Sequence, residues 1–461
     1  MSPSFADPDA PSRPLHLVAA AEAPAFVAAR PAPERAWLEA AGFTGALGQT
    51  VILPGSDGAP SAAVFGWGTD SDRRRGRFHL ARAAETLPEG AWHLDAPLDT
   101  EASQEAALGW LLAGYRFTRY HASKRPVAAL RPPAGVDAAR LIAIAEAEYL
   151  ARDLINTPAS DLGPSELEAA FVALGQQHRA ATEVVRGDDL LGAGFPMVHA
   201  VGRASSRAPR LMQLNWGTSG PRLTLVGKGV CFDTGGLDLK PAAGMGLMKK
   251  DMGGAASVMA LAHAIMALQL PLRLRVIVPA VENAVSANAM RPQDILTSRK
   301  GLTVEINNTD AEGRLILADA LALADEVPPD LVVSMATLTG AARVALGPDI
   351  VPFYTDDGAL AATLAKAGER VADPVWRMPF WDPYEPLIEP GIADLDNAPS
   401  GGMAGSVTAA LFLRRFVTAS PRYLHFDIYG WQPKAEPGRP KGGVAQGARA
   451  LLEALPEVLG L

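Results

Sequence analysis

Apolar, strand-like runs alternate with alanine-rich helical patterns through the second half of the chain. The strand-like runs lie at residues 223–226, 274–278, 331–334 and 423–428. The helical patterns between them cover residues 253–268, 315–324 and 406–417. Strands that alternate with helices form a parallel or mixed sheet that packs between helices. The alternation therefore predicts a larger α/β domain, with a mixed central sheet covered by helices on both faces, which we place at residues 166–461.

The first third of the chain predicts a smaller N-terminal α/β domain at residues 15–130. Residues 50–53 and 62–67 have the composition of strands, and residues 101–115 have a helical pattern. Helix-breaking residues at 131–135 precede a long alanine-rich pattern, so we expect a linker helix within residues 131–165. Residues 1–14 include four prolines, and we expect this segment to be disordered.

The composition argues against some classes of function. The 461 residues are 48% hydrophobic and 20% charged, which is typical of a globular protein. A formal net charge of −8 argues against a general electrostatic affinity for nucleic acid or anionic membranes. The one dense basic run, at residues 73–77, is short and follows two aspartates. We interpret it as a solvated loop rather than an anion-binding patch.

Cysteine usage and apolar stretches indicate the compartment. A single cysteine, Cys231, excludes an intrachain disulfide and fits a reducing environment. We interpret it as a buried core residue rather than a reactive thiol. The N-terminus lacks a basic segment leading into an apolar core, and the longest apolar stretch, residues 255–270, contains polar residues. We therefore expect no secretory signal, no membrane span and a cytoplasmic location.

Two acidic residues in the segment NTDAEGRL, residues 308–315, point to a metal site. In extended backbone Asp310 and Glu312 face the same side, because side chains alternate between faces. Two carboxylates aimed at one point repel each other unless a cation lies between them. Gly313 allows a sharp turn, and Arg314 adds a permanent positive charge. A strand-to-helix turn with capping residues explains the same segment without a metal, so the octamer alone leaves both interpretations open.

Two further segments carry a family resemblance. They are VGKGVCFDTGGLDLKP at residues 226–241 and MKKDMGGA at residues 248–255. Together with NTDAEGRL they closely resemble, in residue type, order and spacing, the leucyl aminopeptidases, two-metal exopeptidases also called cytosol aminopeptidases. The resemblance runs from about Arg152 to the C-terminus. It implies that residues 166–461 form a catalytic metallopeptidase domain.

The resemblance implies a site for two divalent metal ions, Mn²⁺ or Zn²⁺. The ligands would be four carboxylates and one amine: Lys228, Asp233, Asp251, Asp310 and Glu312. Carboxylate oxygens are hard ligands that suit several divalent cations. Asp233 and Glu312 would bridge the two metals. Lys228 can coordinate only as a neutral amine, so burial and the metal must lower its pKa.

The resemblance also assigns two catalytic residues and an apolar substrate pocket. Lys240 would stabilise the oxyanion, and Arg314 would hold a bicarbonate ion that relays a proton. The pocket for the first side chain would be lined by Met248, Thr337, Leu338 and Gly340. This chain departs from the family at Lys250, where an apolar or aromatic residue is common, and at residues 429–431 (Tyr-Gly-Trp).

The implied function is a metal-dependent aminopeptidase that releases leucine or other apolar N-terminal residues from peptides. A two-metal-bound water or hydroxide would attack the first peptide carbonyl. The alternatives are a dipeptidase such as a cysteinylglycine hydrolase, and a DNA-binding regulatory role on the same fold, against which the acidic balance weighs. Phosphoryl transfer is disfavoured because no G-x-x-x-x-G-K-[ST] run is present. The resemblance further implies a homohexamer.

Overall fold

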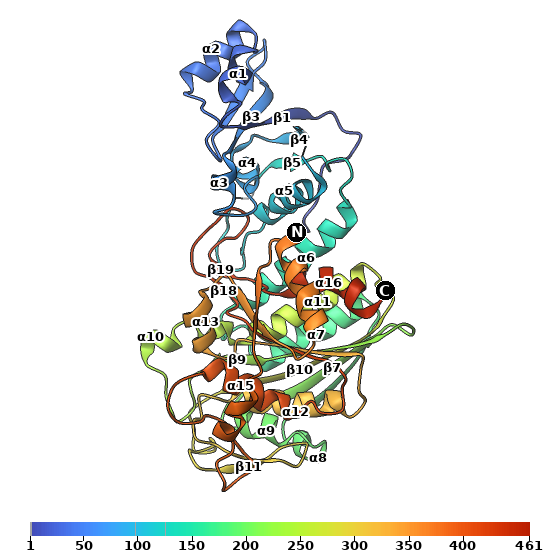
Figure 1. Ribbon diagram of the computed structural model, residues 1–461, viewed down its shortest axis with the longest axis vertical. Helices are drawn as coiled ribbons and strands as arrows, with labels where there is room; N and C mark the ends of the chain where they lie inside the picture. Colours follow the sequence, from blue (N-terminus) through green and yellow to red (C-terminus); the bar gives the residue numbers. More distant parts are fainter. Residues whose placement is uncertain (1, 97, 125) are drawn as a thin grey trace. The chain divides into compact units, whose positions relative to one another are not determined.

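The computed structural model describes residues 2–96, 98–124 and 126–461, and these form two compact units. The first contains the chain up to Tyr149 together with Lys434–Lys441, and the second contains Leu150–Pro433 together with Gly442–Leu461. Within the described ranges, every helix is too short or too polar to cross a lipid bilayer. Figure 1 labels the elements in chain order.

The N-terminal unit is built on a five-stranded sheet in the order β2-β3-β1-β4-β5. Strand β1 pairs in parallel with β3 and β4, whereas β2 is antiparallel to β3. The predicted strands at 50–53 and 62–67 and the helix at 101–115 are confirmed. The elements are β1 (Arg13–Ala19), α1 (Ala23–Ala28), α2 (Ala32–Ala40), β2 (Thr50–Pro54), β3 (Pro60–Gly68), α3 (Asp70–Arg73), α4 (Ala81–Thr86), β4 (Gly90–Asp95), α5 (Thr100–Ala113) and β5 (Ala128–Leu130).

The boundary of the N-terminal unit differs from the expected one. Helix α6 (Ala138–Asn156) lies within the range expected for the linker helix, 131–165, and the division between the units falls inside it. Tyr149 of α6 donates a hydrogen bond of 2.6 Å to the carbonyl oxygen of Leu111, which ties this part of the helix to α5. The segment 434–441 returns to the same unit, where Gly438 lies against Phe78 and Leu112. A contact between segments so far apart in the chain leaves no mark in local sequence patterns.

The segment expected to be disordered packs onto the N-terminal sheet. Residues 2–12 form no helix or strand, but the amide of Ala6 donates to the carbonyl oxygen of Leu130 at 2.8 Å. The hydroxyl of Ser12 lies 2.9 Å from Nδ1 of His93. Strand β1 then begins at Arg13, inside the expected disordered range, because its backbone pairs with β4. Met1 lies outside the described residues.

The second unit contains the mixed central sheet that the alternation predicts. Its order is β15-β14-β17-β13-β8-β10-β7-β6, with β9 pairing β10. Strands β17, β13, β8 and β10 are parallel neighbours, and β7, β6 and β14 add antiparallel pairings. The strands are β6 (Ala181–Arg186), β7 (Arg210–Trp216), β8 (Arg222–Gly227), β9 (Gly229–Asp233), β10 (Arg273–Asn283), β13 (Leu331–Ala336), β14 (Val351–Tyr354), β15 (Val375–Met378) and β17 (Tyr423–Asp427).

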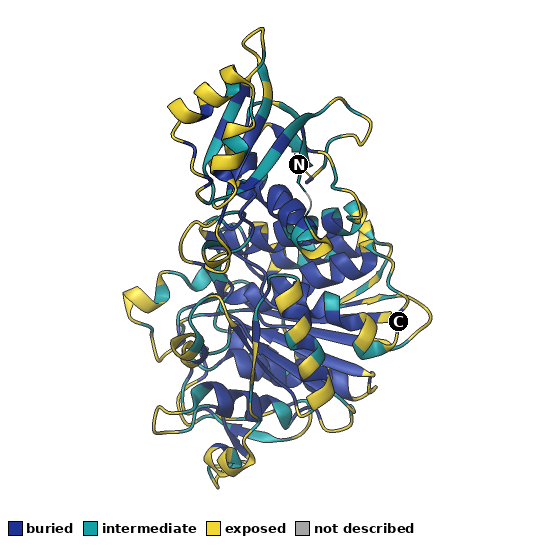
Figure 2. Ribbon diagram, turned by 45° about the horizontal axis from the view of Figure 1, so that its top comes forward, coloured by how far each residue is buried: buried dark blue, intermediate teal, exposed yellow. Residues whose placement is uncertain are grey.

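Helices cover both faces of this sheet. Figure 1 shows α7, α11 and α16 on one face and α9, α12 and α15 on the other. Every residue of β13 is buried, as expected for a strand between two helical layers, and Figure 2 shows the central strands in the buried colour. The helices are α7 (Pro164–Gln177), α8 (Asp189–Gly192), α9 (Pro196–Gly202), α10 (Ala242–Met245), α11 (Gly253–Ala267), α12 (Gly313–Asp325), α13 (Gly340–Leu346), α14 (Gly358–Arg370), α15 (Gly405–Arg414) and α16 (Ala448–Leu459).

Short elements complete the second unit. The strand-like run at residues 302–306 forms β12 (Thr303–Glu305), but β12 belongs to a separate small sheet with β11 (Ile295–Thr297) and β16 (Leu395–Asp396). Strands β18 (Trp431–Gln432) and β19 (Gly442–Gly443) form a hairpin-like pair. Two 3-10 helices, η1 (Met248–Met252) and η2 (Asp382–Ile388), lie in connecting segments. Of these, η1 carries a predicted metal ligand.

Candidate metal centre

The residues expected to bind metal gather where the parallel strands of the central sheet end. Lys228 joins β8 to β9, and Asp233 is the last residue of β9. Asp310 and Glu312 lie in the loop that leads into α12, and Asp251 lies in η1. In open α/β sheets, ligand sites form beyond the carboxyl ends of the strands, because the loops that follow them converge there.

Three carboxylates lie close enough to share a metal ion. Oxygen atoms of Asp233, Asp310 and Glu312 all lie within 4.8 Å of one another. Asp251 joins them through Lys228, whose Nζ lies 2.8 Å from Asp251 Oδ2 and 3.1 Å from Glu312 Oε1. Asp233, Asp251 and Glu312 are all buried. The structure thus brings all five residues that the resemblance names as ligands into one cluster.

Lys228 acts as a counter-ion within this acidic cluster. Its Nζ also donates to the carbonyl oxygen of Thr337 at 3.0 Å. Burial acts to lower the pKa of Lys228, but the charges of Asp251 and Glu312 outweigh it and raise the pKa. The expectation of a lowered pKa is therefore not met by burial alone. For Lys228 to bind a metal as a neutral amine, the incoming cation must displace its proton.

Gly313 makes room for the Lys228 side chain. A Cβ atom built on Gly313 would lie 2.3 Å from Cε of Lys228 and 2.7 Å from its Nζ. Gly313 is absent from the residues with positive φ and begins α12. The sequence suggests a sharp turn for this glycine, and that interpretation is wrong. Its missing side chain instead lets the lysine cross the start of the helix.

Glu312, Asp310 and Asp251 have raised pKa values and hold their protons more tightly than ordinary carboxyl groups. Burial, followed by repulsion from Asp233, raises the pKa of Glu312 to about 8. The same two causes raise the pKa of Asp310 to about 6. Burial also raises the pKa of Asp251. A divalent cation would relieve both the repulsion and the loss of hydration, because it supplies positive charge and replaces water as the partner of the oxygens.

The donor atoms fit a pair of divalent cations. The oxygens Asp251 Oδ2, Asp310 Oδ1 and Glu312 Oε1 are buried, and within the described part of the chain no donor other than a lysine amine contacts them. Their recorded neighbours are the amines of Lys228 and Lys240. Each carboxylate oxygen can accept more than one partner, so a bound cation would complete their coordination. The oxygen-rich set suits manganese, zinc, cobalt or magnesium.

Lys240 faces the same cluster from the loop after β9. Its Nζ lies 2.9 Å from Asp233 Oδ2 and also contacts Asp310 Oδ1. Burial acts to lower the pKa of Lys240, but these two carboxylates outweigh it and raise the pKa. The residue therefore carries a positive charge at the edge of the cluster. Such a charge can stabilise a developing oxyanion.

Arg314 lies in the first turn of α12, and its guanidinium is buried. One amine, Nη1, donates to the carbonyl oxygen of Asn397. The Nε atom is buried and has no hydrogen-bond partner among the residues the structure describes. Burial lowers the pKa of Arg314 to about 10, so the side chain stays charged at neutral pH. A small planar anion would satisfy this group, since guanidinium binds such anions through parallel hydrogen bonds.

Polar residues that the sequence analysis overlooks hold the ligand loops in place. Asn283, at the end of β10, donates from Nδ2 to Asp233 Oδ1 at 2.9 Å and to the carbonyl oxygen of Thr309 at 3.1 Å. The side-chain oxygen of Asn397 accepts the amides of Asn307 and Asn308. Asn283 could have been found, because it ends a strand at this edge of the sheet. Asn397 is brought in from a distant segment and has no local pattern.

The residues expected to form the substrate pocket lie beside the cluster. Met248 is in η1 with Asp251, and Thr337 donates from Oγ1 to Asp251 Oδ1 at 2.7 Å. Leu338 is half-buried and packs against the core of the second unit, and Gly340 begins α13. The expected pocket residues thus come from two segments next to Asp251.

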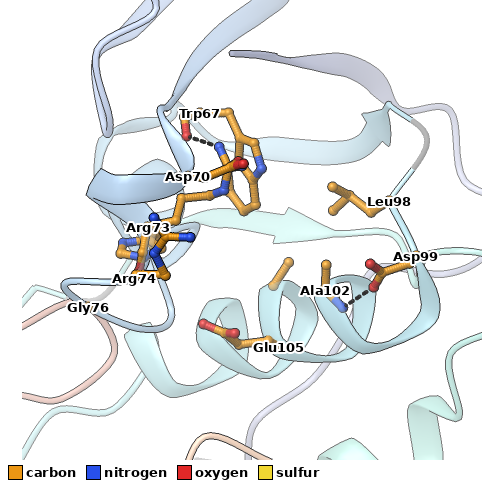
Figure 3. Close-up of a pocket in the computed structure, with 11 residues that line it drawn as sticks. Trp67, Asp70, Arg73, Arg74, Gly76, Leu98, Asp99, Ala102 and Glu105 are labelled. Carbon is orange, nitrogen blue, oxygen red and sulfur yellow. Dashed lines mark hydrogen bonds and ion pairs between the residues drawn. The ribbon is translucent and has the colours of Figure 1, made fainter. Parts of the chain in front are cut away.

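A separate cavity lies in the N-terminal unit, and none of its lining residues is assigned to the metal centre. It has a volume of about 510 Å³, and its lining includes Trp67, Arg73, His79 and Glu105. Figure 3 shows Arg73 beside the ring of Trp67, with a hydrogen bond to the Trp67 carbonyl oxygen of 2.9 Å. Arg73 ends the short helix α3 and pairs with Asp70, whereas Arg74 and Arg75 lie exposed in the turn that follows, as a solvated loop would.

Comparisons with known proteins agree with this geometry. The model of the cytosol aminopeptidase family, catalytic domain, matches residues 149–452, and that of the M17 aminopeptidase N-terminal domain matches residues 13–133. A probable cytosol aminopeptidase of Syntrophotalea carbinolica is 39% identical over 447 residues, which cover 90% of either chain. One from Roseiflexus castenholzii is 37% identical and covers 92% of this chain and 93% of its own.

Solved structures share the whole fold. The crystal structure of the cytosol aminopeptidase from Coxiella burnetii has a TM-score of 0.92 and 42% identity, covering 97% of each chain. The bottromycin maturation enzyme BotP in complex with Mn has a TM-score of 0.86 and 32% identity, covering 97% of this chain and 99% of its own. The chain belongs to the cytosol aminopeptidase family, a family of hydrolases.

Proposed function

We propose that this chain is a metal-dependent aminopeptidase that removes single residues from the free N-terminus of peptides. The observation that carries this proposal is the cluster of Asp233, Asp310 and Glu312, two of them buried and Asp310 half-buried, whose oxygens converge within 4.8 Å beside two lysines. Two divalent ions, manganese or zinc, are the occupants this cluster fits, with Lys228 and Asp251 completing the ligand set. When bound, such ions lower the pKa of water and polarise a carbonyl oxygen.

Residues of the chain would position the metal ligands, stabilise the developing negative charge and help to transfer the proton. The carboxylates fix the position of the site, and Thr337 orients Asp251 through its hydrogen bond of 2.7 Å. Lys240 places a positive charge next to Asp310, where the oxygen of the scissile carbonyl would become negative. The free Nε of Arg314 supports a bicarbonate ion that would accept the proton released by the attacking water. No serine or cysteine nucleophile is needed.

The manganese complex of BotP supports manganese as one usable metal, since that relative shares 32% identity with this chain. On the resemblance alone, the released residue would be leucine or another apolar residue. The expected homohexamer and the cytoplasmic location stay predictions. Light scattering on the purified protein would test the hexamer.

The test is hydrolysis of leucine para-nitroanilide by metal-stripped protein, with Mn²⁺ or Zn²⁺ added back. Activity that returns with metal in the parent, and stays absent in Asp310→Ala, is the expected result, because Asp310 supplies a shared oxygen. Dipeptides with other N-terminal residues extend the test to a dipeptidase. If metals restore activity toward none of these substrates, the aminopeptidase proposal fails.

A further inference from the structure

Lys250 is an unexpected charge in the wall of the metal centre. It precedes the ligand Asp251 in η1 and is only 5% exposed. Lysine is almost never buried to this extent unless an acid neutralises it. Within the described ranges, its side chain has no hydrogen bond and no ion-pair contact, and its recorded neighbour is the ring of Tyr429 at 4.7 Å from Nζ. The amine therefore has unused hydrogen-bonding capacity.

A second cation lies against the same ring. The guanidinium carbon of Arg343, on α13, lies 4.9 Å from the centre of the Tyr429 ring. The Arg343 side chain likewise lacks a hydrogen bond or an ion-pair contact within the described part of the chain. The buried amine of Lys250 and the exposed guanidinium of Arg343 thus lie against one aromatic ring, which attracts each of them but does not cancel their mutual repulsion. An anion placed between the two side chains would offset this repulsion.

Two acids act on Lys250 through space, Asp251 and Asp427, and both have other partners. Asp251 contacts the amine of Lys228 and accepts the hydroxyl of Thr337. Asp427 is buried at the end of β17. Its Oδ1 accepts the amides of Leu338 and Thr339, and its Oδ2 accepts the hydroxyls of Thr339 and Ser406. These hydrogen bonds occupy the carboxylate and hold it away from an ion pair with Lys250. Among the residues the structure describes, neither acid forms an ion pair with Lys250 or Arg343.

The position of this cationic group relates it to one part of a substrate. Lys240, the expected partner of the scissile carbonyl, contacts Asp310, whereas Lys250 is adjacent to Asp251. A peptide with its carbonyl beside Lys240 would direct its α-amine and its first side chain toward Asp251, since both are bonded to the next carbon. Arg343 lies near Gly340, one of the expected pocket residues. We therefore infer that the first side chain extends along the expected pocket residues toward Lys250 and Arg343.

We propose that Lys250 and Arg343 select peptides whose N-terminal residue is glutamate or aspartate. This inference rests on the proposed aminopeptidase function and replaces the apolar preference that the resemblance alone implies. The carboxylate of the first side chain accepts hydrogen bonds from the Lys250 amine and pairs with the Arg343 guanidinium. The ring of Tyr429 fixes the position of both donors.

The test compares glutamyl, glutaminyl and leucyl para-nitroanilides with the manganese-loaded enzyme. Glutamine has the shape of glutamate without the charge, so the ratio of kcat/KM for the glutamyl over the glutaminyl substrate isolates the electrostatic part. We expect this ratio to exceed one and to fall by about 10- to 100-fold in Lys250→Met, the size expected for a hydrogen bond to a charged group. Arg343→Gln lowers the same ratio, and Lys366→Met, an exposed lysine on α14, is the matched control.

Two further measurements separate selection from misfolding. Lys250→Met keeps or raises the melting temperature of the metal-free protein, because it removes a buried unpaired charge. Calorimetry with free L-glutamate shows weaker binding to this variant than to the parent. Equal or better hydrolysis of the leucyl substrate, with ratios unchanged in both variants, overturns the inference and leaves the aminopeptidase function intact. Dependence on a free C-terminal carboxylate of a dipeptide, lost in its amide, would also overturn it. Absence of activity on all substrates overturns both proposals.

Discussion

Substituting Gly313 by alanine tests whether the Lys228 side chain has to cross the start of α12. Carbon atoms in contact stay about 3.5–4.0 Å apart. The new Cβ would lie 2.3 Å from Lys228 Cε, so the lysine or the helix must move by more than about 1 Å. Such a movement would break the contacts of 2.8 Å to Asp251 and 3.1 Å to Glu312.

The expected effects on stability and on activity differ in size. Alanine favours helix over glycine by about 1 kcal/mol, and overpacking costs about 1–3 kcal/mol, so the net loss of stability is at most about 2 kcal/mol. Displacing a group of the site by about 1 Å costs on the order of 100-fold in rate. We therefore expect Gly313→Ala to lose about 100-fold in kcat/KM while its unfolding transition stays cooperative.

The assay combines leucine para-nitroanilide hydrolysis, manganese titration by calorimetry and thermal unfolding. Gly192→Ala is the control, because Gly192 lies in α8 with open space where its Cβ would be. We expect this control to keep the parent activity. If Gly313→Ala also keeps the parent kcat/KM and manganese affinity, the steric role of Gly313 is refuted.

Three other predictions follow from buried polar groups. Burial lowers the pKa of His425 to about 3, so the folded state holds it neutral, and stability is complete above its unfolded pKa near 6.5 and is lost as the pH falls. Urea titrations should show about 2 kcal/mol less stability at pH 5 than at pH 7 from this group, and His425→Gln should lose that part of the pH dependence. Lys240→Met should lower kcat for leucine para-nitroanilide by about 10²–10³ with little change in KM, because it removes the positive charge from the oxyanion position, and an unaltered kcat would contradict that role. Asp325 accepts the amides of Thr418, Ala419 and Ser420. Asp325→Ala should destabilise the protein by about 1–3 kcal/mol in chemical unfolding, and a midpoint equal to that of the parent would show that the loop finds other partners.

Local sequence patterns predict the elements whose own periodicity decides their burial. The apolar run at 331–334 becomes the fully buried β13, and the pattern at 253–268 becomes α11. Local sequence patterns do not show which strands pair with each other in a sheet. The run at 302–306 does form a strand, β12, but its backbone pairs with β16 in a separate small sheet. The composition of a segment predicts that it forms a strand. The neighbouring strand with which it pairs is known only from the folded structure.

The ligand set is visible in the sequence because Asp310 and Glu312 are two residues apart, and because the lysine and the remaining acids lie in recognisable segments. The electrostatic environment of these ligands cannot be read from the sequence. The raised pKa of Lys228 depends on Asp251 and Glu312, which come from different elements. The cationic group at Tyr429 likewise needs residues from η1 and α13. The strength of an electrostatic interaction depends on the distance between the charges, and that distance is known only from the folded structure.

The return of residues 434–441 to the N-terminal unit means that the chain crosses the division between the units three times: after Tyr149, after Pro433 and after Lys441. Each unit is therefore built from two separate segments of the chain. Consider a chimera in which residues 1–149 come from a relative and the rest from this chain. Its segment 434–441 would have to pack against α5 of the relative. In this chain Gly438 of that segment lies against Phe78 and Leu112. Recombination between homologous genes would therefore succeed more often when both pieces are inherited together.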